Sequence, residues 1–323
     1  MKKTIGRKSL SWIILLALLC FVNVGFTQTD IMPKDGPGKT YYDNGTLFEE
    51  MNYVNYSLDG PYKLYYPNGI LKAECNFKAN KKEGLYKKYL ENGKLEFERH
   101  YKNDLKDGSY VGYYANGNKF IECLFLNDKL NGAYKEYYEN GNLKCDFTYK
   151  DDLKDGPYKS YHENGNLKMV TTLKLDLKDG LHRDYDVNGK LITECTYKNG
   201  NFNGPFKTFF DSGVIKTETN YINGIQEGQR KEYHSSGALQ YICNYVNGKE
   251  DGTMKMFHDN GNLEIIITYV NGVKNGPYKF YFKNGNINFD TNNKNGKIDG
   301  SMKLYSEDGT FLGDLLYKDG VIL

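Results

Sequence analysis

Tyrosine and lysine side chains recur in this sequence at a fixed interval, and they are the groups best suited to contact a ligand. An aromatic residue returns every 24 residues from Tyr41 to Tyr305, and a lysine often stands two positions before it. Aromatic faces stack on sugars and apolar side chains, while lysine makes salt-sensitive contacts with phosphate or carboxylate groups. We therefore predict a binding ladder that consists of Tyr65, Tyr89, Tyr113, Tyr137, Tyr161, Tyr185, Tyr233, Lys159, Lys231 and Lys255.

The aromatic row has a second interpretation, in which it stabilises the protein's own fold. If the repeats form a sheet of one layer, no second layer covers the apolar side chains, and neighbouring aromatic rows must pack on each other instead. The sequence leaves both interpretations of the ladder open.

Catalytic side chains would have to converge at one place and break the repeat there, and the sequence contains no such break. His234 and His258 occupy the same position in neighbouring repeats, where Tyr or Phe is common. They could make a weak metal or glycan contact, but we interpret them as substitutes for the aromatic residue. We predict a protein that is not an enzyme, has no catalytic residues and binds no cofactor. The complete set of histidines is His100, His162, His182, His234 and His258.

The cysteines and the acidic segments lack the spacing of metal sites. Cys75, Cys123, Cys195 and Cys243 share one position in their repeats, and Cys145 lies two residues earlier in its own. With two strands per repeat, Cys75 and Cys123 would lie roughly 19 Å apart, beyond the ~7 Å limit for a disulfide. We predict five free, half-buried thiols and no zinc site. Acidic segments such as residues 151–156 match no calcium-loop pattern and are typical of turns.

The charge of the chain argues against a nucleic-acid partner. The sequence has 43 basic and 41 acidic side chains, so it lacks the excess of lysine and arginine that binds a phosphate backbone. We expect no nucleic acid among its partners.

Two series of glycines define a tandem array with a strict 24-residue period. The second series follows nine residues behind the first, so two backbone positions in each repeat require glycine. The first series is Gly36, Gly60, Gly84, Gly108, Gly132, Gly156, Gly180, Gly204, Gly228, Gly252, Gly276 and Gly300.

Each repeat predicts a β-hairpin. Asn140-Gly141 and its equivalents lie between two alternating apolar runs, and Asn-Gly favours a type I′ turn because both residues tolerate positive φ. The second junction, such as residues 151–156, is expected to be longer and polar. We predict an all-β fold, an elongated twisted antiparallel β-meander of about twelve hairpin repeats.

The hairpin turn also predicts which residues face each other. The lysine three residues after the first glycine should stand opposite the acidic residue fourteen after it, as in Lys63 with Glu74, Lys87 with Glu98, Lys135 with Asp146 and Lys207 with Glu218. Where Val170, Ile242 and Ile266 replace the acid, Lys159, Lys231 and Lys255 should be free. The opposite, more apolar face should be packed and should collect the cysteines, a second aromatic row from Tyr53 to Tyr269, and the leucines Leu71, Leu95, Leu143, Leu167, Leu191, Leu239 and Leu263.

The N-terminus resembles an export sequence. A basic start precedes an apolar stretch from Trp12 to Val24, and small residues flank a cleavage point near Thr27-Gln28. We predict residues 1–27 as a signal peptide, 28–35 as a short linker and 36–323 as twelve repeats, in a protein that is secreted, periplasmic or on the cell surface. An uncleaved anchor is the alternative, although the stretch is shorter than the ~20 residues that span a bilayer. Lipidation at Cys20 is a third option, but Leu19 is bulkier than the residue such sites use.

The motif Asp59-Gly60-Pro61-Tyr62-Lys63, followed by Asn68-Gly69-Ile70-Leu71-Lys72, resembles the MORN-repeat variant of many bacterial proteins. The resemblance extends over residues 36–323 and implies hairpin units in a twisted antiparallel sheet. Such arrays often carry the label YwqK-type antitoxin, and some MORN proteins bind lipid. This chain departs from the standard pattern, because Tyr or Phe stands where Trp is frequent.

From these features we expect an exported, non-enzymatic scaffold that binds a protein or a cell-envelope component through its Tyr and Lys surface. An antitoxin or immunity protein is the alternative function, and phospholipid or glycan binding is a further one. Membrane contact is not favoured. The partner, the binding face and the oligomeric state do not follow from the sequence.

Overall fold

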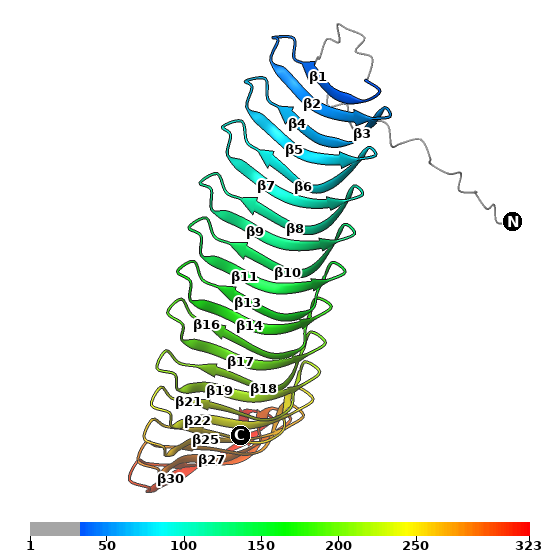
Figure 1. The fold of residues 1–323 in the computed structure, drawn as a ribbon. Coiled ribbons are helices and arrows are strands. Elements are labelled where there is room, and N and C mark those ends of the chain that lie inside the picture. Colours follow the sequence, from blue (N-terminus) through cyan, green and yellow to red (C-terminus); the bar gives the residue numbers. More distant parts are fainter. Residues whose placement is uncertain (1–32) are drawn as a thin grey trace, which may run out of the picture. The chain divides into compact units, whose positions relative to one another are not determined.

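The computed structural model describes residues 33–323, in which every regular element is a β-strand (Figure 1). Successive strands pair antiparallel, so the predicted all-β meander of hairpin repeats is confirmed. The predicted signal peptide, residues 1–27, lies outside the described residues. Within residues 33–323, no helix is long and apolar enough to cross a membrane.

The described residues divide into two compact units, one that ends at Lys106 and one that covers Asp107–Leu323. The first unit contains three hairpins, each of which repeats the same order of strand, turn and strand. Their strands are β1 (Gly36–Tyr41) with β2 (Leu47–Val54), β4 (Gly60–Tyr65) with β5 (Leu71–Lys78), and β6 (Lys81–Tyr89) with β7 (Leu95–Lys102).

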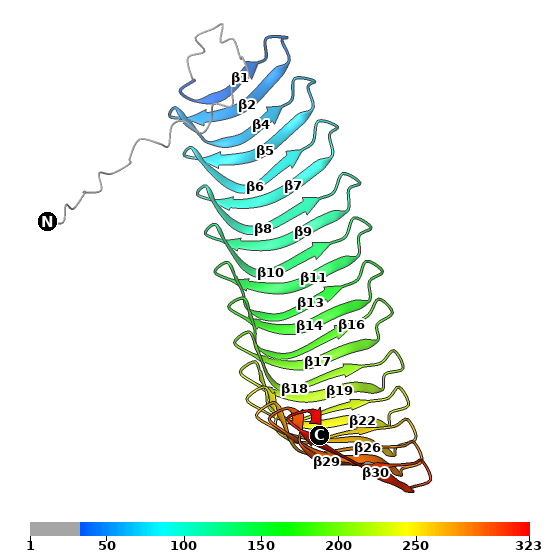
Figure 2. The ribbon, with the colours of Figure 1, turned by 180° about the vertical axis from the view of Figure 1, so that it is seen from behind.

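The second unit contains nine hairpins, and its first strand begins two residues before the boundary. Figure 2 shows the same strands from behind. The pairs are β8 (Leu105–Tyr113) with β9 (Lys119–Leu126), β10 (Lys129–Tyr137) with β11 (Leu143–Lys150), β13 (Gly156–Tyr161) with β14 (Leu167–Lys174), β16 (Gly180–Tyr185) with β17 (Leu191–Lys198), β18 (Asn201–Phe209) with β19 (Ile215–Ile222), β21 (Gly228–Tyr233) with β22 (Leu239–Val246), β24 (Gly252–Phe257) with β25 (Leu263–Val270), β26 (Val273–Tyr281) with β27 (Ile287–Lys294), and β29 (Gly300–Tyr305) with β30 (Phe311–Lys318).

Seven further strands are two-residue segments, and six of them precede the first glycine of a repeat. The break between such a segment and the main strand is a local bulge. At one of them Gly156 has a φ of +113°, and a Cβ there would lie 2.7 Å from Thr148 Oγ1. The first glycines share a positive φ, which residues other than glycine rarely adopt, and this explains why glycine recurs there. The segments are β3 (Ser57–Leu58), β12 (Leu153–Lys154), β15 (Leu177–Lys178), β20 (Ile225–Gln226), β23 (Lys249–Glu250), β28 (Lys297–Ile298) and β31 (Val321–Ile322).

The predicted type I′ turn at Asn-Gly is wrong. The Gly141 amide donates to Tyr138 O at 2.9 Å, and only Gly141 (φ +92°), not Asn140, has positive φ. This is a type I turn followed by a left-handed glycine, which Asn-Gly serves equally well. The Asn140 side chain accepts a hydrogen bond from the Asn142 amide at 2.9 Å and so holds the turn without a positive φ of its own.

The type I′ turn is instead at the second junction, which is shorter than predicted. Lys198 pairs with Asn201, so only two residues form the loop. Both have positive φ, +49° at Asn199 and +81° at Gly200. In earlier repeats the same two positions hold other residues, including Leu175 at +50°.

The predicted register is confirmed for each of the four tested pairs. Lys63 stands opposite Glu74, Lys87 opposite Glu98, Lys135 opposite Asp146 and Lys207 opposite Glu218.

The predicted face of the leucines is wrong, because a bulge interrupts each hairpin near its turn. Glu136 pairs with Cys145, but the next residue, Tyr137, pairs with Leu143, so Lys144 is left over. Directly paired residues share a face, and one extra residue changes the side on which all residues beyond it lie. The leucines therefore lie on the ladder face rather than with the cysteines.

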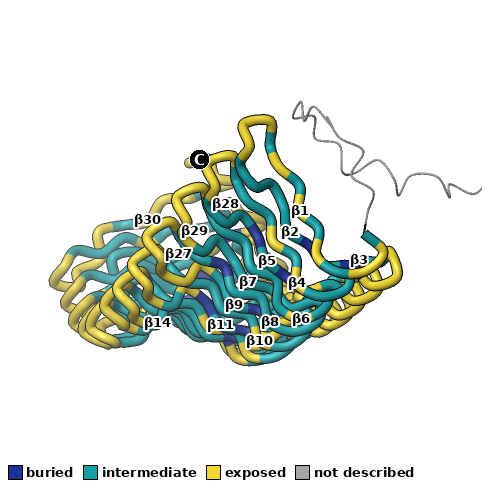
Figure 3. Tube along the Cα trace, turned by 45° about the horizontal axis from the view of Figure 1, so that its top comes forward, coloured by how far each residue is buried: buried dark blue, intermediate teal, exposed yellow. Residues whose placement is uncertain are grey.

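The opposite face is the packed one, as predicted. Its most buried position is fifteen residues after the first glycine, and dark segments mark such buried residues inside the sheet in Figure 3. We call this the core row, and its buried members are Met51, Cys75, Cys123, Phe147, Thr171, Cys195, Thr219, Cys243, Ile267 and Thr291. Neighbouring aromatic rings complete the packing: Phe147 lies 4.7 Å from Tyr134 and 5.1 Å from Tyr158, centroid to centroid.

The left-handed conformation of Leu175 gives a stability prediction. An ordinary L-residue in this conformation is strained by roughly 1–2 kcal/mol, whereas asparagine tolerates it. Leu175 is 52% exposed, so its replacement removes little buried surface. We expect Leu175→Asn to stabilise the protein by about 1 kcal/mol, measured from the denaturation midpoint and from amide exchange in β14 and β15. The matched change Asn199→Leu, one repeat later, should destabilise by a similar amount; equal midpoints for both variants would contradict this account of the turn.

Candidate functional site

The tyrosines of the predicted ladder are tied to the acidic residues of the preceding repeat. We call the residues fourteen positions after each first glycine the acidic row. In four places a glutamate of this row meets a ladder tyrosine across the strand boundary. The hydroxyl donates to the carboxylate from Tyr65 to Glu50 at 2.9 Å, Tyr89 to Glu74 at 2.7 Å, Tyr137 to Glu122 at 2.5 Å and Tyr233 to Glu218 at 2.6 Å.

Tyr161 and Tyr185 of the ladder stand in different surroundings. Tyr161 follows Asp146, whose side chain is one methylene shorter, and Tyr185 follows Val170. Tyr113 follows Glu98, as the four linked tyrosines follow their glutamates, and is half-buried in β8 opposite Lys119. The regular spacing of the ladder therefore conceals differences that arise from the acidic row.

These hydroxyl bonds change the ionisation of both partners. Burial, and then the hydrogen bond to its glutamate, raises the pKa of Tyr65, Tyr89 and Tyr233 to about 12. The bond from Tyr233 lowers the pKa of Glu218. The hydroxyl groups thus act as internal links between repeats, which supports the structural interpretation of the ladder for these tyrosines. The lysines beside them remain as the groups that can meet a partner.

The three lysines predicted to be free differ from one another. Lys231 is not free, because its Nζ lies 3.4 Å from Glu218 Oε1 on the preceding hairpin. The prediction considered only the partner within its own hairpin, Ile242, although a central strand has a neighbour on each side. Lys159 is exposed and stands between Val170 and Asp146. Lys255 is exposed between two isoleucines, Ile242 and Ile266.

Other cations of this lysine row form the ion pairs that the register allows. Lys39 lies 2.6 Å from Glu50, Arg183 2.7 Å from Glu194 and Lys279 2.9 Å from Asp290. Each pair is partly exposed and contributes at most about 1 kcal/mol. Their main effect is to hold the carboxylates in a defined place on the ladder face.

Two shallow hollows on the ladder face are built from the same repeat positions. One, of about 220 Å³, is lined by Lys207 and Lys231 on either side of Glu218, with Pro205, Asn220 and Gln229 around them. The other, of about 230 Å³, lies in the first unit and is lined by Lys39 and Lys63 on either side of Glu50, with Pro37, Asn52 and Pro61. The two hollows share one arrangement: two ammonium groups flank one carboxylate, and an amide lies beside them.

Three histidines make the same bond that tyrosine makes in other repeats. Tyr138 OH donates to Tyr161 O at 2.9 Å, one repeat further along the chain. The Nε2 atoms of His162, His234 and His258 lie 3.0, 3.2 and 3.2 Å from the equivalent carbonyl oxygens. The interpretation of His234 and His258 as substitutes for an aromatic residue is confirmed.

His182 is different, because it lies in the packed face. Burial lowers its pKa, although its Nε2 lies 2.9 Å from Asp184 Oδ2, which favours the protonated form. Its ring meets Tyr197 edge-on at 5.4 Å. We see in it a buried neutral imidazole that fills the place of the usual tyrosine.

The five cysteines of the described range are free and are buried more deeply than predicted. Burial raises the pKa of Cys75, Cys145 and Cys195 to about 11, so these thiols are protonated and unreactive at neutral pH. Among residues 33–323, no group of three His, Cys, Asp or Glu side chains is placed to hold a metal ion.

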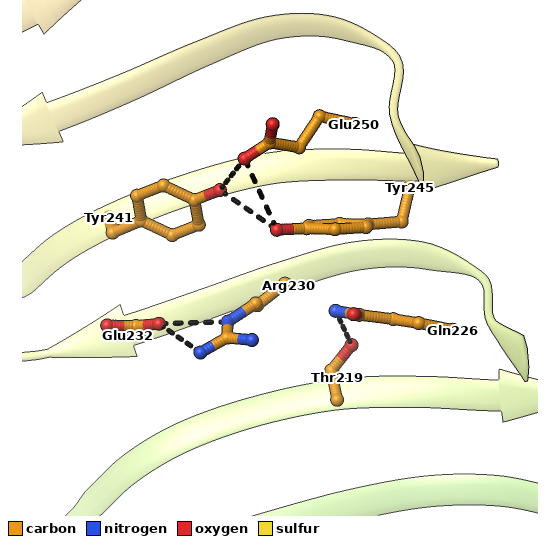
Figure 4. A network of polar contacts seen from close by, with 7 residues as sticks. All are labelled: Thr219, Gln226, Arg230, Glu232, Tyr241, Tyr245 and Glu250. Carbon is orange, nitrogen blue, oxygen red and sulfur yellow. Dashed lines mark hydrogen bonds and ion pairs between the residues drawn. The ribbon is translucent and has the colours of Figure 1, made fainter. Parts of the chain in front are cut away.

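A polar network on the packed face was not predicted (Figure 4). Arg230 Nε donates to Glu232 Oε1 at 2.8 Å. On the next strand, the hydroxyls of Tyr241 and Tyr245 lie 3.3 and 3.4 Å from Glu250 Oε1. Arg230 stands where most repeats have an aromatic residue. This substitution is the feature of the sequence that could have indicated the network. The polar groups form hydrogen bonds with one another. We therefore interpret the network as a structural feature of the otherwise apolar packed face.

Comparison with protein families agrees with this geometry. Ten segments match the family described as MORN repeat variant: residues 34–55, 58–79, 82–103, 130–151, 154–174, 178–199, 202–223, 226–247, 250–271 and 274–295. The chain belongs to the MORN repeat variant family. Its repeats form a scaffold of the kind used for binding, and the family is generally non-catalytic.

Other comparisons add no functional information. No curated protein matches the chain. Among solved structures, a TcdB2-TccC3-Cdc42 complex matches with 12% identity and a TM-score of 0.19, over 88% of this chain and 18% of that chain. A Tc holotoxin pore from Photorhabdus luminescens matches with 13% identity and a TM-score of 0.19, over 89% and 18%. The MORN array spans less than a fifth of those chains, and such scores support no argument about fold or function.

The hydroxyl link predicts a difference between two ladder tyrosines. Tyr233→Phe removes the bond to Glu218 and should destabilise the protein by about 1 kcal/mol. Tyr281→Phe is the matched control, because Ile266 occupies the acidic-row position before it and the change should be nearly neutral. Denaturation midpoints and amide exchange in β19 and β21 measure the effect. If the two variants lose equal stability, the link to the glutamate is not what stabilises the ladder.

The lowered pKa of Glu218 gives a pH dependence with a definite sign. Because the folded pKa lies below the ordinary value of about 4.3, the ionised carboxylate stabilises the fold fully above that pH, and this contribution is lost as pH falls through the folded pKa. In Tyr233→Phe the pKa of Glu218 should rise toward its ordinary value. Carboxyl-carbon NMR titration of both proteins measures this, and an unchanged Glu218 pKa would refute the assignment.

Proposed function

We propose that this protein is a non-enzymatic, exported scaffold that binds a protein or cell-envelope component through the ladder face. The recurrent hollow supports this proposal most directly. In both units it offers two ammonium groups, one carboxylate and an amide in the same arrangement. Such a set can donate hydrogen bonds to an extended polar partner and accept them from it. If the partner contacts several repeats, the weak contacts add up.

The chemistry of the hollow favours binding over catalysis. The carboxylates of Glu50 and Glu218 have lowered pKa values, so at neutral pH they are ionised and poor proton donors. In the first unit, the hydrogen bond to Glu50 raises the pKa of Lys39. A partner would therefore meet fixed charges of both signs rather than a group poised to transfer a proton.

The place of action is part of the proposal. The basic start and the apolar stretch of residues 1–27 support export, and the cleaved protein would begin at Gln28. An antitoxin role remains the alternative, which the identity of the bound partner decides.

Charge removal on the ladder face should weaken partner recovery. We expect the double variant Lys207→Gln and Lys231→Gln to recover at least fivefold less partner from an envelope extract than the unaltered protein, since roughly 1 kcal/mol of lost binding has that effect. The control carries Lys190→Gln and Lys297→Gln, which remove the same charge from exposed residues outside the hollow. Cross-linking with mass spectrometry measures recovery.

Equal recovery by the ladder and control variants would rule out the ladder face as the binding surface. A recovered partner that is a toxin, and whose activity the protein blocks, would replace the scaffold proposal with the antitoxin alternative.

A further inference from the structure

Charges alternate along the lysine and acidic rows of the second unit, except at Val111, Val170, Ile242 and Ile266. Lysine or arginine on one strand usually faces an acid on the next, as in Lys207, Glu218 and Lys231. On β22 and β25 the acid is replaced by Ile242 and Ile266. The row then runs Lys231, Ile242, Lys255, Ile266, Lys279 across β21, β22, β24, β25 and β26.

Lys255 is the one lysine of this run whose charge has no acidic neighbour in the row. Lys231 lies 3.4 Å from Glu218, and Lys279 lies 2.9 Å from Asp290. Lys255 is exposed and faces an isoleucine on both sides. An unneutralised ammonium group is therefore held in a fixed place on the ladder face.

Apolar side chains frame this ammonium group. Ile242 and Ile266 are half-buried, each one strand away from Lys255, which is about 4.8 Å in a sheet. The ladder residue of the same strand is Phe257, so no tyrosine hydroxyl is present there. Glu264, the acid nearest along β25, takes the position left over at the bulge, beyond Ile265, which pairs with Met256.

The backbone beneath this patch is already used. Strand β24 pairs with β22 on one side and β25 on the other, so it has no free edge. A partner can engage the patch only through side chains, which makes the ammonium group and its two apolar neighbours the recognition elements.

We propose that Lys255, Ile242 and Ile266 form the specificity-determining patch of the ladder face, and that it binds an acidic, extended segment of a protein partner. This inference rests on the proposed binding function. One carboxylate of the segment pairs with Lys255, and apolar side chains on either side of it lie on the two isoleucines. Along the sheet the repeat advances about 9.6 Å for two strands, close to the roughly 9.3 Å of one polyproline II turn of three residues.

Charge number distinguishes this occupant from a membrane. Stable binding to an anionic lipid surface uses a cluster of roughly four to eight basic residues. Here the cations next to Lys255 are already matched by Glu218 and Asp290. One unmatched lysine between two isoleucines fits a single carboxylate with apolar neighbours.

The test uses the full chain and a synthetic peptide of about twelve residues made of Leu-Pro-Glu triplets, which favour the polyproline II conformation. Methyl NMR of isoleucine-labelled protein should show shifts at Ile242 and Ile266 on peptide addition. Ile242→Glu restores the acid found in other repeats and should weaken binding at least tenfold, as should Lys255→Ala. The matched control Val170→Glu adds the same acid where Lys159 and Arg183 already have acidic neighbours, and binding should be unchanged.

A peptide with Gln in place of Glu should bind at least tenfold more weakly than the acidic peptide. Equal affinity for the two peptides, no binding of the acidic peptide, or equal effects of Ile242→Glu and Val170→Glu would overturn the proposal. Vesicles containing phosphatidylserine that bind the protein in a Lys255-dependent way, when the peptide does not, would replace it with a membrane surface.

The same variants separate this inference from the function it rests on. If Ile242→Glu leaves recovery of the envelope partner unchanged but the Lys207 and Lys231 variant weakens it, the patch is wrong and the scaffold function stands. If neither variant affects recovery, both are wrong.

Discussion

A sheet of one layer has no second layer to cover it, and this constraint governs the rest of the structure. Each hairpin can bury apolar surface only against its own strands and the hairpins beside it. The core row meets this constraint on one face, with Cys243, Met254 and Ile267 packed together in the second unit. On the other face and at the turns, hydrogen bonds join one repeat to the next: Tyr138 to Tyr161 O, and Asn140 Nδ2 to Glu163 O at 3.0 Å.

Such bonds require that equivalent atoms return at the same place in every repeat. A repeat one residue longer would move the Tyr138 hydroxyl away from its carbonyl and reverse the faces of the strand that follows. The strict glycine period is therefore a consequence of contacts between repeats as much as of the turns themselves. This is why a side chain as different as His162 can occupy the tyrosine position, provided that a nitrogen reaches the carbonyl oxygen.

The fold and the register could be predicted because they depend on spacing alone. Lys135 stands opposite Asp146 as soon as the hairpin is centred on Asn140-Gly141, whatever the turn type. The turn types could not be predicted from the sequence, because Asn-Gly suits two turn geometries. The choice between them depends on the lengths of the two loops in each repeat. The face on which Leu143 lies depends on a bulge, at which Lys144 has no partner in the strand register. Nothing in the residue types indicates this bulge. The ion pair of Lys231 joins two hairpins, so the spacing within one hairpin does not reveal it.

The candidate site was predicted only in part for the same reason. Spacing identified the ladder and the lysines, but the hydrogen bonds that engage Tyr65 or Tyr233 belong to pairs of repeats. Through those bonds the tyrosines link neighbouring repeats. The features of the ladder face that vary between repeats are therefore the lysines and the acidic residues between them. The acidic row, rather than the ladder, distinguishes one repeat from another.

The two-residue turn at the second junction carries one more consequence. Asn199 and Gly200 join two hairpins without spare residues, and the hydrogen bonds described above join neighbouring hairpins. One whole repeat can therefore be lost or gained and the remaining ends still fit. Array length is thus independent of the local structure. A lineage could lengthen or shorten this protein in steps of one repeat, and each step would relocate features such as Lys255 along the sheet while leaving their surroundings intact.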